Sequence, residues 1–253
     1  EDFKNLWSKV QKFEVDNLPK SALKIVEEIY AKAKKDNNSS QLIKTLFYKS
    51  KFALILEDDA QLKVINEFKK HISESKFPTK NVLENVLGNL YWQYFQQNRW
   101  KFYQRTKTAT KVDEADFRTW DLNTLFSEIH ANFQASLKDR LLLQQINIYD
   151  FADILQVQKN SKIYRPSLFD FLAHNALDFY KTPENNITKP AYQFKVENPK
   201  LLDKARAFSV LNIITKDNLS LQFNALKIYQ DLIAVHINDK NLQALATVDL
   251  ERL

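Results

Sequence analysis

Apolar residues recur at every third or fourth position along almost the whole chain, which is the spacing of amphipathic α-helices. In the first segment they stand at positions 3, 6, 7, 10 and 13, and Asp2 precedes them as the expected helix cap. Asp121 is likewise the expected cap of the helix at 122–137, and Ser39 or Ser40 is the expected cap of the third helix. The same pattern predicts helices at about 3–13, 19–35, 40–54, 59–72, 81–103, 122–137, 139–145, 148–155, 168–179, 200–215, 219–237 and 241–253. The sequence therefore predicts an all-α fold.

The stretch 182–199 interrupts this pattern. It carries three of the six prolines, and residues 191–196 alternate between apolar and polar side chains, which favours one short extended segment. We expect a single helical domain over 1–253, and a division into 1–181 and 200–253 stays open. The chain has no methionine, so we expect it to be excised from a longer protein.

Two helical segments share a short internal similarity. Residues 22–25 and 225–228 have the same sequence, Ala-Leu-Lys-Ile, and each predicted helix ends in a turn of Asn, Asp and Lys. Small residues opposite aromatic ones are typical of tetratricopeptide-type hairpins. This predicts stacked antiparallel helix hairpins, as a tetratricopeptide-like array or an irregular α-solenoid, and an irregular bundle is the alternative.

The chain contains a single glycine, Gly88, where average usage of about 7% would give about 18. Glycine-rich phosphate loops and dinucleotide fingerprints are therefore excluded. Gly88 falls inside a predicted helix, where glycine costs up to about 1 kcal/mol relative to alanine. We expect it to be buried where this helix closely approaches a neighbour.

The absence of cysteine and the distribution of charge exclude or disfavour further functions. Without cysteine there is no disulfide, thiolate nucleophile or cysteine-ligated metal. The net charge of +6 arises from 37 basic and 31 acidic residues spread along the chain, which gives little support to nucleic-acid binding. The longest apolar runs are too short to span a bilayer.

Asp170, His174 and Asp178 are the sharpest candidates for chemistry, because their spacing places them on one helix face. Two carboxylates flanking an imidazole could hold a metal or exchange a proton. The flanking residues are mostly apolar, so the preferred interpretation is a buried histidine in helix packing.

The remaining histidines give weaker patterns. Glu67, His71 and Glu74 share a face but lack a second nearby histidine, which favours a solvated surface, and His130 and His236 stand alone. We therefore assign no catalytic, cofactor-binding or metal-binding residue, expect no cofactor, and expect no enzyme activity.

The stretch 91–107 mixes aromatic and basic residues, as platforms for single-stranded nucleic acid do. The preferred interpretation is a core helix whose aromatic residues point inward and whose bases gather at its C-terminal end. A groove for a peptide or protein is another option.

Several strings together resemble the N-terminal region of bacterial alpha-2-macroglobulin-like proteins, in the subfamily with a long helical section ahead of the macroglobulin domains. The strings are LPKSAL (18–23), QLIK (41–44), YWQYFQQNRW (91–100), RTWDL (118–122) and RPSLFDFLAH (165–174). They follow in order over most of the chain.

This resemblance implies an exported cell-envelope protein related to protease-trapping inhibitors, attached to the membrane only through an anchor upstream of this chain. The expected role is a non-catalytic scaffold or protein-interaction domain. The expected partners are the macroglobulin domains of the same polypeptide, an envelope protein or a target protease, and no nucleic acid. The alternatives are a cytoplasmic helical-repeat adaptor and a nucleic-acid-binding domain that uses 91–107.

Overall fold

The computed structural model describes residues 2–104, 113–155, 158, 160–186 and 192–253, and these are all-helical. The α-helices are α1 (Phe3–Val15), α2 (Pro19–Lys35), α3 (Ser39–Leu56), α4 (Ala60–Glu74), α5 (Thr79–Gln104), α6 (Leu122–Leu137), α7 (Arg140–Leu143), α8 (Ser161–Tyr164), α9 (Leu168–Tyr180), α10 (Ala205–Ser209), α11 (Leu221–His236) and α12 (Gln243–Arg252). Short 3-10 turns are η1 (Phe117–Thr119), η2 (Ile148–Phe151), η3 (Pro183–Asn186) and η4 (Pro199–Leu202). The predicted fold class is confirmed.

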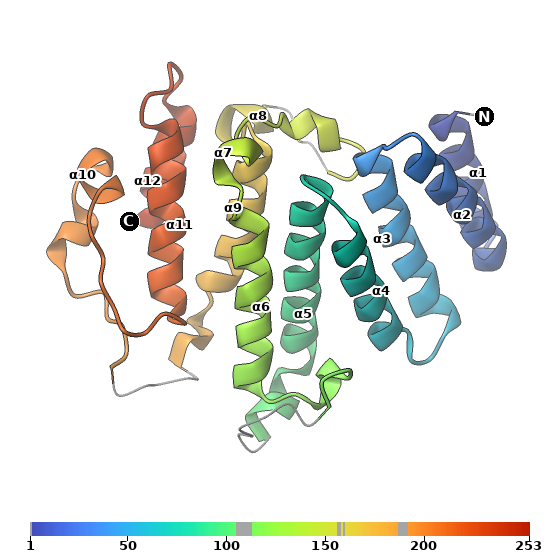
Figure 1. Ribbon diagram of the computed structural model, residues 1–253, viewed down its shortest axis with the longest axis horizontal. Helices are drawn as coiled ribbons and strands as arrows, with labels where there is room; N and C mark the ends of the chain where they lie inside the picture. Colours follow the sequence, from blue (N-terminus) through green and yellow to red (C-terminus); the bar gives the residue numbers. More distant parts are fainter. Residues whose placement is uncertain (1, 105–112, 156–157, 159, 187–191) are drawn as a thin grey trace.

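The helices stack as antiparallel hairpins, as Figure 1 shows. From α1 to α6 each long helix packs against the next one in the chain. Helix α9 then packs against α5 and α6, and α11 packs against α9. Helices α10 and α12 lie against α11, so the C-terminal part of the chain is built onto the stack through α9.

Side-chain caps begin several helices. Asp2 and Asp121 accept hydrogen bonds from backbone N–H groups of α1 and α6, as the sequence predicted. The predicted cap of α3 at Ser39 or Ser40 is wrong. The side chain of Asn38 accepts from Gln41 N instead (3.0 Å), and both serines lie inside the helix.

Asparagine takes the left-handed positions that glycine usually occupies. Asn17 and Asn37 have φ of 54° and 51° at the ends of α1 and α2. The next amides, of Leu18 and Asn38, donate back to the carbonyls of Phe13 and Ala33 and so complete the hydrogen bonds of a Schellman cap. A chain with one glycine can therefore still end its helices with sharp turns.

Helix α5 lies at the centre of the core, and Gly88 is buried in it as predicted. A Cβ atom at Gly88 would lie 3.3 Å from three ring atoms of Phe133 on α6. Phe133 is itself fully buried and packs against Phe179 and Tyr180 of α9. The missing side chain at Gly88 thus lets α5, α6 and α9 meet around one aromatic ring.

One prediction for the C-terminal part is wrong. The predicted helix at 200–215 is replaced by η4 and the short α10, which are followed by a non-helical segment at 211–220. The side-chain amide of Gln230 donates to the carbonyls of Phe208 and Leu211 (2.8 and 2.7 Å), which ties the end of α10 to α11. The β-branched residues that follow have low helix propensity.

The predicted extended segment at 191–196 is non-helical where the structure describes it. Residue 191 lies outside the described residues, and 192–196 form no strand pairing. The backbone N–H of Phe194 donates to the Asp217 carboxylate (3.1 Å), which holds this segment near the start of α11. The boundary at 182–199 stays a prediction, and Leu177 and Leu232 on its two sides belong to the same hydrophobic cluster.

Replacing Gly88 tests the close approach of α5 and α6. Because the buried Phe133 ring has little room to move, we expect Gly88→Leu to lower the free energy of unfolding by about 3 kcal/mol through overpacking. Gln93→Leu, on the exposed side of the same helix, should change it by less than about 0.5 kcal/mol. Urea denaturation followed by circular dichroism measures both, and equal stabilities would contradict the packing described here.

Candidate protein-interaction site

The aromatic stretch in α5 belongs mainly to the core. Tyr91, Trp92, Tyr94 and Phe95 are buried, and Trp92 packs against Phe179 with ring centroids 5.3 Å apart. Only the C-terminal end of α5 exposes rings, at Trp100 and Tyr103. Residues 105–107 of the predicted platform lie outside the described residues.

His71 is buried, so the predicted solvated face at Glu67, His71 and Glu74 is wrong for this histidine. Its ring packs edge-on against Tyr30 (5.6 Å between centroids), and its Nε2 lies 3.9 Å from the Glu67 carboxylate. His71 and the Lys49 ammonium hold the pKa of Glu67 below its ordinary value, although burial opposes them. Glu74 is exposed and takes no part.

Asp170, His174 and Asp178 do not form one site. Asp178 is exposed, while His174 is buried and its Nδ1 lies 2.7 Å from the backbone carbonyl of Asp170. Burial and the nearby positive charge of Arg165 lower the pKa of His174. The interpretation as a histidine within helix packing therefore agrees with its surroundings.

His130 and His236 were expected to stand alone, but both have side-chain partners. His130 Nδ1 lies 2.8 Å from the Tyr180 hydroxyl. His236, at the end of α11, lies between two carboxylates: its Nε2 is 2.6 Å from Asp170 and its Nδ1 is 2.7 Å from Asp239. This second arrangement joins α9, α11 and the turn before α12.

The local sequence explains why Asp170 can be fully buried there. It is the third residue of α9, and its second carboxylate oxygen accepts hydrogen bonds from the backbone N–H and hydroxyl of Ser167. Its first oxygen faces His236. Burial alone would lower the pKa of His236, but the hydrogen bonds and charges of Asp170 and Asp239 outweigh it and raise that pKa.

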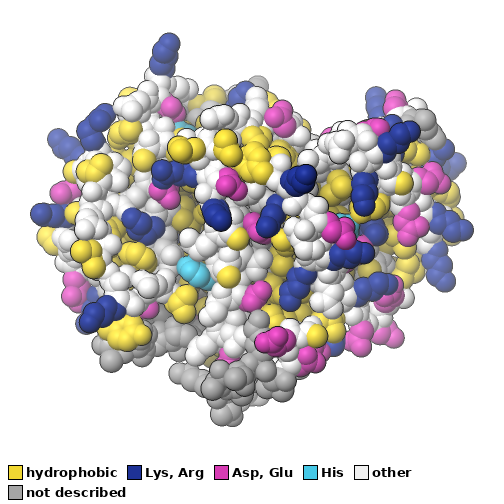
Figure 2. Space-filling model, viewed as in Figure 1, with side chains coloured by type: hydrophobic (Ala, Val, Ile, Leu, Met, Phe, Trp, Pro, Cys, Tyr) yellow, Lys and Arg dark blue, Asp and Glu magenta, His cyan; other side chains and the backbone are white. Residues whose placement is uncertain are grey.

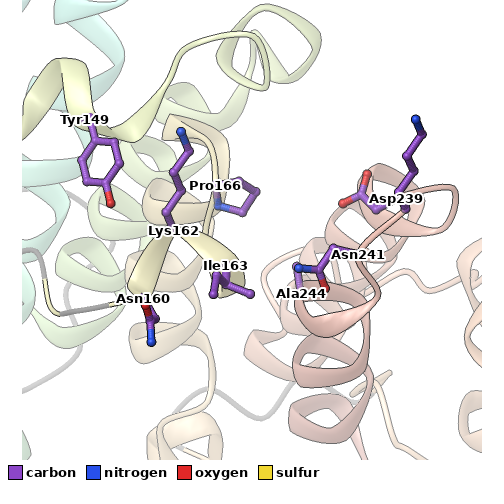
Figure 3. Close-up of a pocket in the computed structure, with 9 residues that line it drawn as sticks. Tyr149, Asn160, Lys162, Ile163, Pro166, Asp239, Asn241 and Ala244 are labelled. Atoms are coloured by element: carbon purple, nitrogen blue, oxygen red, sulfur yellow. The ribbon is translucent and has the colours of Figure 1, made fainter.

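An open groove lies beside this cluster. One wall comes from segments 144–149 and 160–167, which contain the start of η2 and all of α8, and the other comes from 235–244, which joins α11 to α12. Two adjoining hollows of about 520 and 360 Å³ share Lys162, Pro166 and Asp239. We call this the α8–α11 groove, and Figure 3 shows its outer part, with Tyr149, Lys162 and Ile163 opposite Asp239 and Asn241.

Large apolar side chains are exposed around the α8–α11 groove. On its walls and beside them these are Tyr149, Ile163, Tyr164 and Leu242, and Leu141 and Leu142 of α7 lie along the same edge of the molecule. Figure 2 shows apolar side chains gathered over this edge near α7, with Lys and Arg around them. Exposed apolar patches of this kind typically mark interaction sites.

No local sequence pattern could indicate this groove, because its two walls are about 70–100 residues apart in the chain. Among the described residues, no group of three or more His, Cys, Asp or Glu side chains could hold a metal ion, and no helix is long and apolar enough to cross a bilayer. The groove offers binding contacts, namely exposed aromatic and aliphatic side chains and two lysines.

Replacing His236 tests the buried cluster. The pKa of His236 is raised above 6.5 in the folded protein, so its stabilisation is complete below pH 6.5 and is lost as pH rises through the folded-state pKa. His236→Gln should lower the free energy of unfolding by about 3 kcal/mol at pH 6, because Asp170 loses its buried counter-charge. The difference in the free energy of unfolding between wild type and variant, measured by urea denaturation, should become smaller as pH rises.

His130→Gln is the matched control. Burial lowers the pKa of His130, so protonation of this histidine destabilises the folded protein as pH falls below 6.5. The free energy of unfolding of wild type, relative to His130→Gln, should therefore increase as pH rises, which is opposite to the trend for His236→Gln. A His236→Gln effect that is the same at every pH would show that the ring is not protonated between the two carboxylates.

The chain matches no family model, no curated protein and no solved structure.

Proposed function

We propose that this chain is a non-catalytic scaffold or protein-interaction domain of an alpha-2-macroglobulin-like protease inhibitor at the cell envelope. The observation that carries the interaction role is the α8–α11 groove with its exposed apolar rim. The resemblance of the five ordered strings supports the family. The absence of cysteine means that a covalent thioester trap would have to lie elsewhere in such a protein.

The hydrogen bonds that buried polar side chains make between helices support a structural role. Asn85 donates to the Ser136 hydroxyl and the Leu172 carbonyl and accepts from Asn175, which links α5, α6 and α9. His236 similarly links α9 and α11. These polar side chains fix helices relative to one another, as a rigid scaffold requires.

A cytoplasmic helical-repeat adaptor would use the same groove, so cellular location separates the two functions. Antibodies raised against this domain should detect the native protein in the envelope fraction, in a polypeptide larger than 29.8 kDa. Detection in the cytosol alone would contradict the envelope assignment and favour the adaptor.

Protease capture tests the proposed family role. Added trypsin should co-precipitate with the native protein, whereas the isolated 1–253 domain should neither bind nor inhibit trypsin, because we propose it as a scaffold and not as the trap. Both are measured by immunoprecipitation and by residual trypsin activity on a protein substrate. Inhibition by the isolated domain, or no capture by the native protein, would overturn this role.

A further inference from the structure

The charges that face the α8–α11 groove are divided into two groups. Asp170 and Asp239 both face the His236 ring, and Asp170 also accepts from Ser167. Asp170 is fully buried and therefore not accessible to a ligand, whereas Asp239, whose side chain is 40% exposed, meets His236 through one oxygen and still lines the groove. Lys162 and Lys240 also line the groove, yet neither forms an ion pair with any described residue.

Two lysines thus face one exposed carboxylate, which His236 already engages, so the net charge that a ligand meets in this groove is positive. The Lys162 ammonium lies over the Tyr149 ring, 5.1 Å from its centroid, so it is held at one wall, and Lys240 lies on the opposite wall. A ligand between the walls would approach both cations. This favours acidic groups on the ligand.

The apolar side chains of the groove add a second requirement. Tyr149 and Ile163 are exposed on one wall, and Leu242 is exposed next to Asn241 on the other. Burying these side chains requires apolar groups on the ligand as well. A two-walled hollow suits a protruding segment of polypeptide better than a flat lipid surface.

We propose that the α8–α11 groove binds an acidic, amphipathic segment of a partner protein, with its carboxylates toward Lys162 and Lys240 and its apolar face toward Tyr149, Ile163 and Leu242. This rests on the proposed interaction function and specifies its partner. It requires no particular secondary structure in the segment beyond one acidic and one apolar face.

A labelled peptide tests this proposal on the intact chain. The probe is a fluorescein-labelled peptide of four Glu-Leu-Glu-Ala repeats, with a Lys-Leu-Lys-Ala counterpart, and fluorescence anisotropy measures binding at low salt and at about 0.3 M KCl. The acidic peptide should bind, should weaken as salt rises, and should bind at least about tenfold more tightly than the basic one. Equal binding of both peptides, or none, would overturn the proposal.

Matched variants locate the site. Lys162→Glu/Lys240→Glu should weaken binding of the acidic peptide about tenfold, whereas Lys20→Glu/Lys24→Glu, an equal charge change at exposed lysines of α2, should change it less than about twofold. Leu242→Ser should weaken binding, and Leu54→Ser should not, although the two leucines are 57% and 55% exposed. Equal effects in either pair would overturn the groove as the site.

Three further measurements distinguish other occupants of the groove and test the proposed function itself. If phosphatidylglycerol vesicles bind, this binding needs Lys162 and Lys240, and no peptide binds, the occupant of the groove is a membrane surface. If the chain dimerises and the Lys162→Glu/Lys240→Glu variant does not, the occupant is a second copy of the chain. A benzophenone side chain in place of Tyr164, which is exposed beside the groove, or of Lys24 of the native protein shows whether the groove alone or the whole interaction function fails. Crosslinks only from position 24 would overturn the groove but keep the interaction function, and crosslinks from neither would contradict both.

Discussion

The close approach of α5 to α6 at Gly88 is the constraint on which the rest of the packing depends. Because Gly88 has no side chain, the Phe133 ring of α6 lies directly against α5, and its other side packs against Phe179 and Tyr180 of α9. Helix α5 also contacts α3 and α4, so one helix orients both the N-terminal stack and α9. Helix α11 and the groove are then built on α9. A larger residue at position 88 would therefore disturb all of these helix contacts together.

Apolar burial holds these helices together but does not by itself fix their register, because it is non-directional. Buried polar groups do, since an unpaired donor or acceptor costs about 1–3 kcal/mol. Asn85 reaches Leu172 and Asn175 only when α5 and α9 have the observed alignment, and His236 reaches Asp170 only when the end of α11 meets the start of α9. The second contact also positions Asp239 and the turn that forms one wall of the groove.

Local signals predicted most of the fold. Asp2 and Asp121 are recognisable as caps because each directly precedes a helical apolar pattern and accepts from a backbone N–H only three residues later. The buried position of Gly88 follows from the cost of glycine in a helix. Choosing Asn38 over Ser39 requires backbone angles that sequence does not show. The same limit explains the wrong helix at 200–215, where contacts from Gln230, some 20 residues later, end α10. His236 and Asp170 are 66 residues apart, so no spacing could pair them, and the groove that they border could not be predicted either.

The groove and the family resemblance support the proposed function independently. The charges of the groove follow from which carboxylates are engaged within the protein, and this depends on tertiary contacts and not on the net charge of +6. An acidic segment could therefore bind there in an envelope inhibitor or in a cytoplasmic adaptor, since both would present the same walls. The resemblance, in turn, concerns cellular location and protease capture, which the groove does not determine. Peptide binding together with a cytosolic location would retain the groove and remove the macroglobulin role, whereas envelope location without peptide binding would do the opposite.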